Sequence, residues 1–96
     1  MSFSFHPEAD EEFNKAIDYY EDIEPGLGYD FAQEVYSTIK RSVEFPKAWP
    51  ALEDEIRRSL VRRFPYGVLY SEEREGIFIV AIMNLHRKPD YWNHRK

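Results

Sequence analysis

Cationic side chains concentrate in one short stretch of this chain, residues 57–63. Two arginine pairs, Arg57-Arg58 and Arg62-Arg63, stand among apolar residues there, and a break at Phe64–Tyr66 follows. A guanidinium group is planar and always charged, and its paired donors fit phosphate and carboxylate groups. The stretch therefore predicts a basic surface for an anionic or acidic target. Two alternatives stay open: a solvated strand face, and arginines paired with acidic helices of the same chain.

A second group of candidates follows the most apolar segment. His86 and His94 have side chains that can transfer a proton near neutral pH, and Arg87 adds a cation. Tyr91 and Trp92 are expected to pack the end of the chain onto the body, and secondarily to reach a target. The histidines have no acidic partner at ligand spacing, so we expect no metal and no cofactor. The absence of cysteine excludes disulfides, thiolate zinc sites and a cysteine nucleophile.

Composition indicates a folded chain with two unlike halves. Its 96 residues predict a single domain over 1–96, and 43% hydrophobic and 17% aromatic residues are typical of a packed core. Residues 1–55 carry a net charge of −10 and residues 56–96 carry +5, which gives −5 overall. The basic half either meets an anionic target or balances the acidic half in space. No leader segment or membrane span is visible, which favours the cytoplasm and no membrane partner.

The periodicity predicts an α+β fold in the order β-α-α-β-β-β. We expect a strand at residues 2–6, helices at Pro7–Ile23 and Gly28–Phe45, a loop at residues 46–55 pinned by Trp49, and strands at Ile56–Phe64, Tyr66–Ser71 and Ile77–Met83. The helix hairpin is expected to pack on one face of a small, mainly antiparallel four-stranded sheet, leaving the other face open. Strict alternation in the predicted strand Ile56–Phe64 would place Arg58, Leu60, Arg62 and Phe64 on one face of the sheet.

An ordered set of short motifs covers nearly the whole chain. The first half contributes Phe5–Glu12, Ala16–Glu21, Pro25–Gly28, Phe31, Glu34-Val35 and Phe45-Pro46; the second contributes Arg57-Arg58, Leu60, Arg62–Tyr66, Tyr70, Val80-Ala81, His86-Arg87 and Pro89–Trp92. This set resembles the RelE/ParE family toxins of type II toxin–antitoxin systems, also called the plasmid stabilisation protein family. The resemblance implies a toxin with the fold described above, neutralised by a cognate protein antitoxin.

The family contains two branches with different targets. Members of RelE type cut mRNA in the ribosome without a metal, and members of ParE type poison DNA gyrase. If the chain is a nuclease, the resemblance implies catalytic roles for Arg58, Arg62 (or Arg63), Arg87 and Tyr91. Residues expected to bind the target or the antitoxin are Arg57, Arg63, Tyr66, His86 and Trp92.

Three departures from the pattern of the nuclease-type members favour a ParE-type function. Gly67 stands where nuclease-type members usually have arginine, Leu60 replaces a basic strand residue, and the net charge is acidic. We therefore expect gyrase inhibition. The alternatives are ribosome-dependent mRNA cleavage and a non-toxic module that only binds a partner. A homodimer or a toxin–antitoxin hetero-oligomer is also expected.

Overall fold

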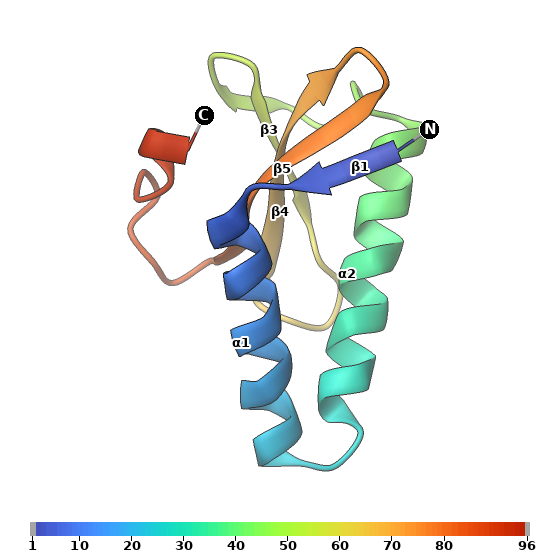
Figure 1. The fold of residues 1–96 in the computed structure, drawn as a ribbon, viewed down its shortest axis with the longest axis vertical. Helices are drawn as coiled ribbons and strands as arrows, with labels where there is room; N and C mark the ends of the chain where they lie inside the picture. Colours follow the sequence, from blue (N-terminus) through green and yellow to red (C-terminus); the bar gives the residue numbers. More distant parts are fainter. Residues whose placement is uncertain (1, 96) are drawn as a thin grey trace.

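The computed structural model describes residues 2–95 (Figure 1). In chain order the elements are β1 (Ser2–Phe5), α1 (Pro7–Ile23), α2 (Leu27–Glu44), β2 (Ala51–Glu53), β3 (Ile56–Leu60), β4 (Tyr66–Glu73), β5 (Gly76–Asn84) and the 3₁₀ turn η1 (Asn93–Arg95). The strands form one sheet in the order β1-β5-β4-β3-β2. Within residues 2–95 only the β1–β5 pair is parallel, so the predicted α+β class with a mainly antiparallel sheet is confirmed.

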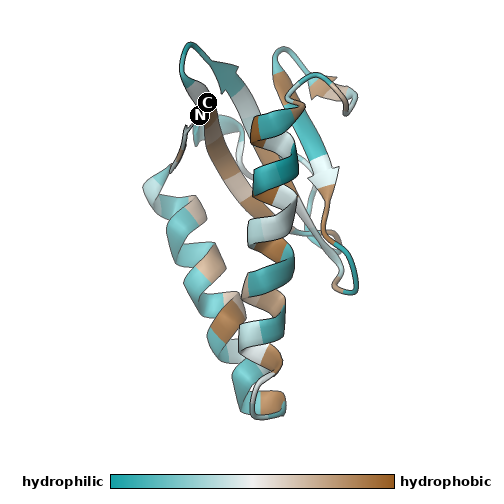
Figure 2. Ribbon diagram, turned by 90° about the vertical axis from the view of Figure 1, so that its right-hand side faces the viewer, coloured by the Kyte–Doolittle hydropathy of each residue, from teal (hydrophilic) through white to brown (hydrophobic). Residues whose placement is uncertain are grey.

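Helix α1 begins and ends where the sequence predicts. The His6 imidazole accepts a hydrogen bond from the Glu8 backbone N–H (3.1 Å), and Pro7 occupies the first turn, where no N–H is needed. The structural role expected for His6 is therefore confirmed. The buried side of the helix carries Ala9, Phe13 and Ala16, which gives the striped pattern of an amphipathic helix (Figure 2).

A carboxylate of α1 fixes the turn between the two helices. Glu21 accepts hydrogen bonds from the backbone N–H groups of Gly26 and Gly28 at 3.0–3.1 Å, so it satisfies donors at the start of α2. A Cβ atom on Gly28 would lie only 2.6 Å from the Ile17 carbonyl oxygen, so glycine allows the helices to approach closely here. The two helices consequently lie side by side as an antiparallel hairpin (Figure 1).

The sheet differs from the prediction in two places. Residues 46–55 are not only loop, because Ala51–Glu53 forms a fifth strand that pairs with β3. Strand β3 ends at Leu60 and not at Phe64, because Arg63 has a left-handed backbone (φ 73°) that an extended strand cannot contain. The turn brings Phe64 into the helix-side core, so the predicted grouping of Phe64 with Arg58 and Leu60 on one face was wrong.

The face of the sheet opposite the helices is also partly covered. Between the helices and the sheet lies the main core, which includes Phe31, Val35, Val68 and Tyr70. Strand residues together with Trp92 of the tail form a second cluster: Ile56, Leu69, Val80, Ala81, Met83 and Trp92. Trp92 is 1% exposed, so the expected packing of the tail is confirmed for this residue, and the expectation of a fully open face was wrong.

No helix among residues 2–95 is long and apolar enough to cross a membrane.

Candidate functional site

The basic strand sends its two arginines to opposite faces of the sheet. Arg57 pairs with Tyr70 on the helix side, and its Nη1 donates to the Trp49 carbonyl oxygen at 2.6 Å. Arg58 pairs with Leu69 on the other face, next to exposed Leu60. Of the two, Arg57 anchors the loop that precedes β2, whereas Arg58 lies on the face that carries the tail.

Gly67 provides the surface on which Arg58 lies. A Cβ built on Gly67 would be 3.1 Å from Arg58 Cγ and 3.2 Å from Arg58 Cδ, with Leu85 Cδ2 at 3.5 Å. Any larger residue at position 67 would therefore compete with the aliphatic stem of Arg58. Gly67 has no cationic side chain of its own, and it sets the position of the neighbouring Arg58 side chain.

The second arginine pair lies in the turn between β3 and β4. Arg63 folds back toward α2, with Nη2 3.6 Å from Asp30 Oδ2 and Nη1 4.0 Å from Glu34 Oε2, and its guanidinium stands 5.3 Å from the Phe64 ring centre. The alternative in which arginines pair with the acidic helices is confirmed for Arg63. Arg62 is exposed in the same turn.

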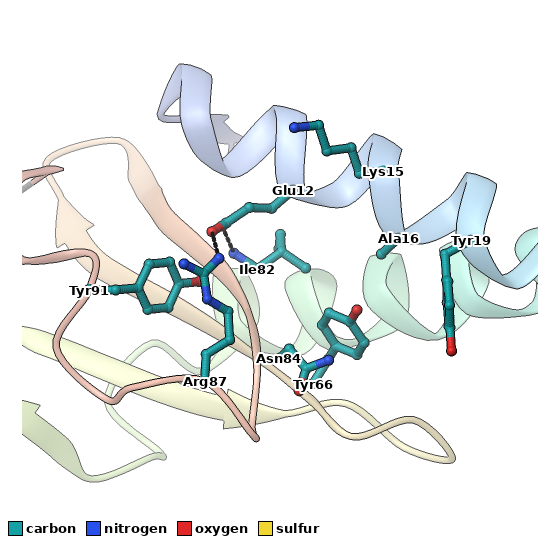
Figure 3. Close-up of a pocket in the computed structure, with 9 residues that line it drawn as sticks. All are labelled: Glu12, Lys15, Ala16, Tyr19, Tyr66, Ile82, Asn84, Arg87 and Tyr91. Carbon is teal, nitrogen blue, oxygen red and sulfur yellow. Dashed lines mark hydrogen bonds and ion pairs between the residues drawn. The ribbon is translucent and has the colours of Figure 1, made fainter.

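A cleft of about 260 Å³ lies between α1, the end of β5 and the tail (Figure 3). Its lining residues are Glu12, Lys15, Ala16, Tyr19, Tyr66, Ile82, Asn84, Arg87 and Tyr91. Three residues predicted from the sequence, Tyr66, Arg87 and Tyr91, are thus brought together. The walls are largely aromatic or aliphatic, and the charged groups gather at the end near Glu12 (Figure 3).

Glu12 is the central acceptor of this region, although its position in the sequence did not predict such a role. Its carboxylate accepts from Arg95 Nη1 (2.9 Å), Arg95 Nη2 (3.0 Å) and the Ile82 backbone N–H (3.0 Å). Arg87 Nη1 lies 3.9 Å from Glu12 Oε2. The sequence showed Glu12 only as one of several carboxylates near a helix N-terminus, and its partner is 83 residues away.

Tyr91 lies beside two cations and is a poor candidate for a general base. The Arg87 guanidinium lies 3.9 Å from its ring centre, and that of Arg95 lies 5.1 Å away. Burial first, and then the neighbouring Glu12 carboxylate, raise the pKa of Tyr91 well above its ordinary value. Its hydroxyl is buried and makes no hydrogen bond to any other residue of 2–95.

The remaining candidates fall outside this cleft. His86 is exposed just after β5, where its backbone N–H donates to Asn84 Oδ1 (2.9 Å). His94 Nε2 is 2.8 Å from Glu8 Oε2, and this hydrogen bond is the main reason that the pKa of Glu8 is lowered. Trp92 belongs to the second core, where it positions the tail instead of offering a surface. Across residues 2–95, no group of three or more His, Cys, Asp and Glu is placed to hold a metal ion.

The cleft is lined by two of the four residues assigned to nuclease chemistry. Arg87 and Tyr91 line it beside α1, whereas Arg58 lies over Gly67 on the face of the sheet away from the helices and Arg62 is in the β3–β4 turn. Cleavage of RNA without a metal needs a base, an acid and phosphate-binding donors around one phosphate. Of the four, Arg58 and Arg62 are not among the residues that line the cleft.

Comparison with known proteins finds a likeness in structure and none in sequence. No protein-family model matches the chain, and no curated protein matches it. Among solved structures, a chain described as "Chromosomal ParDE TA system from P. aeruginosa" is similar, with a TM-score of 0.77 and 18% sequence identity. The likeness covers 90% of this chain and 97% of that chain, so the two share one fold over almost their full lengths.

Proposed function

We propose that this protein is the toxin of a type II toxin–antitoxin pair, held inactive in the cytoplasm by a cognate protein antitoxin. The observation that carries the proposal is the fold shared over 90% of the chain with a protein of a ParDE toxin–antitoxin system. The ordered motifs that resemble RelE/ParE toxins support it independently, since they were found in the sequence alone. A hetero-oligomer with the antitoxin and a homodimer both remain predictions of this proposal.

Within that class we favour the ParE type, which inhibits DNA gyrase. The lining of the cleft supports this choice, because it includes Arg87 but neither Arg58 nor Arg62, and a nuclease would need them around one phosphate. Glu12 also neutralises the charge near Arg87, and the raised pKa of Tyr91 removes a candidate base. Gly67 stands where nuclease-type members usually have arginine, and it has no side chain that could bind a phosphate.

The class is tested by expressing the protein with and without its neighbour. Induction of the toxin alone should arrest bacterial growth, and co-expression of the adjacent small open reading frame should restore it. The two proteins should then co-purify as a complex. Normal growth despite a high level of soluble protein would contradict a toxin, and would favour the module that only binds a partner.

The branch is tested with two assays on the purified protein. A ParE-type toxin should inhibit DNA supercoiling by gyrase and leave mRNA intact in a translating extract. New mRNA 5′ ends mapped in that extract, together with unaffected supercoiling, would instead establish the RelE type. The same preparation should lose its effect in both assays when the antitoxin is added, which controls for contaminating nuclease.

A further inference from the structure

Glu12 fills a set of donors that is built to hold an anion. Both terminal nitrogens of Arg95 bond one carboxylate oxygen each, at 2.9 and 3.0 Å, and the Ile82 N–H reaches the same group at 3.0 Å. Arg87 Nη1 stands 3.9 Å away. Two guanidinium groups and a backbone N–H around one oxyanion are the donors that proteins use for phosphate as well as for carboxylate.

These donors are fixed in place by the fold and not by Glu12 alone. Only 6% of the Arg95 side chain is exposed, and its Nη1 also donates to the Val80 carbonyl oxygen at 3.2 Å. Strand β1 pairs with β5 only as far as Ile79, so the N–H of Ile82 lies beyond the last paired residue and is available to a side chain. The guanidinium groups of Arg87 and Arg95 also lie 3.9 and 5.1 Å from the centre of the Tyr91 ring.

Solvent reaches Glu12 from two sides. The cleft of about 260 Å³ ends at Glu12, and a second cavity of about 310 Å³ is lined by Glu8, Glu11, Glu12, Lys15, Arg87 and Arg95. The second cavity reaches Arg95 directly. An ion the size of phosphate can therefore approach the donors without removal of the tail.

The charged side chains that line the second cavity balance one another when Glu12 is included. Of the residues that line the second cavity, three are cationic (Lys15, Arg87 and Arg95) and three are acidic (Glu8, Glu11 and Glu12). Removal of Glu12 leaves an excess of one positive charge. It also leaves two N–H groups of Arg95 and one of Ile82 without their acceptor, which is costly at a largely buried position.

We propose that these residues form a phosphate-binding site that the chain's own Glu12 occupies. Glu12 is an intramolecular plug: it keeps Arg87 and Arg95 from binding a phosphate group of nucleic acid while the helix α1 is docked. This inference concerns anion binding and does not rest on the proposed gyrase target. The phosphate can come from a nucleic-acid backbone or from free phosphate, and the two are separated below.

The test compares Glu12→Ala with Glu11→Ala, which removes the same charge from an exposed neighbour. Inorganic phosphate is titrated into each variant at constant ionic strength, and binding is followed by ³¹P NMR and by the melting temperature. Glu12→Ala should bind phosphate at least about tenfold more tightly than the wild type or Glu11→Ala, and its melting temperature alone should rise with phosphate. The added change Arg87→Ala should weaken that binding.

Poor folding of Glu12→Ala does not remove the test. In that case phosphate, or acetate as a carboxylate substitute, should restore the folded state of Glu12→Ala more than chloride does. The site would be overturned if phosphate and chloride stabilised Glu12→Ala equally, or if phosphate stabilised Glu11→Ala as much as Glu12→Ala. A short single-stranded RNA should bind Glu12→Ala more tightly than Glu11→Ala; binding of free phosphate without this RNA difference would overturn the plug role.

Discussion

The aliphatic stem of Arg58 lies against Gly67, where a Cβ atom would approach Arg58 Cγ to 3.1 Å. The two residues belong to neighbouring strands, on the face of the sheet away from the helices. The glycine therefore has a packing role in this chain, in addition to being a position without a cation. Substitution at 67 is expected to act through Arg58.

Gly67→Ala should destabilise the protein by about 1 kcal/mol or less, because the stem of the partly exposed Arg58 can shift by the few tenths of an ångström required. The same substitution in an Arg58→Ala background should cost less, or should stabilise the protein by restricting the unfolded chain. Urea unfolding of the four proteins of this double-mutant cycle measures the coupling. Equal costs in both backgrounds would show that Arg58 does not limit the space at Gly67.

Arg95→Ala should destabilise the protein by about 3–5 kcal/mol, because it leaves the Glu12 carboxylate largely buried without its main partner. The tail should detach at the same time, which would expose Trp92 and shift its fluorescence to longer wavelength. Lys15→Ala is the control: its pair with Glu11 is exposed, with 81% and 70% of the two side chains accessible, and should contribute about 0.5 kcal/mol or less. Similar losses of stability in Arg95→Ala and Lys15→Ala would mean that the Glu12–Arg95 pair contributes no more than an exposed ion pair.

Local patterns in the sequence predict the helices well and the tail poorly. Pro7 and the segment Glu24–Gly26 mark the limits of α1 because capping and helix breaking depend on neighbouring residues. The predicted strand runs past the end of β3 because residues 61–64 continue the alternation of the strand. The positive φ of Arg63, which ends the extended backbone, cannot be recognised from that alternation. Strand β2 is three residues long and exists through its pairing with β3.

The candidate site was predictable in its residue types but not in its partners. Arg87, Tyr91 and Tyr66 were identified from the sequence, and the structure places all three along one cleft. Glu12 was missed because nothing near it in the sequence distinguishes it from Glu8 or Glu11. Only the return of the tail, which brings Arg95 to α1, makes one of these carboxylates an internal ligand.

Acid should weaken the contact between Glu8 and His94. The hydrogen bond from His94 lowers the pKa of Glu8 in the folded state below its ordinary value of 4.5. The contact therefore stabilises the fold fully above that ordinary value, and its contribution is lost as the pH falls through the lowered pKa. Because Glu8 is on the surface, the effect is small.

Melting temperatures from pH 7 down to pH 3 for wild type, Glu8→Gln and His94→Ala measure this contribution. Below about pH 4.5 the wild type should lose stability more steeply than either variant. Parallel curves for the three proteins would mean that the pair adds nothing to the pH dependence.

Tyr91→Phe should change the stability by no more than about 1 kcal/mol, because the hydroxyl has no hydrogen-bonded partner to lose and the ring contact with Arg87 is retained. In a spectrophotometric titration the variant should lack a phenol that ionises above the ordinary range for tyrosine. If the chain is the proposed toxin, growth inhibition should also survive the change. Loss of toxicity together with loss of mRNA cleavage in Tyr91→Phe would assign the phenol a catalytic role and support the RelE type.

Arg62 provides the sharpest test of the basic turn, because Arg74 offers a matched control. Both side chains are exposed in turns, Arg62 between β3 and β4 and Arg74 between β4 and β5. Each change to alanine removes one charge and should alter the stability by about 0.5 kcal/mol or less. If the proposed ParE-type function holds and the turn contacts the target, Arg62→Ala should raise the concentration needed to inhibit gyrase by about tenfold, whereas Arg74→Ala should not.

The affinity for the antitoxin, measured separately for Arg62→Ala and Arg74→Ala, decides which partner the turn contacts. A loss in gyrase inhibition with unchanged antitoxin binding would assign Arg62 to the target surface. The reverse result would assign it to the antitoxin surface, since removal of a contact weakens only the complex in which that contact forms. Equal behaviour of both variants in both assays would show that the exposed cation at 62 is part of a solvated surface.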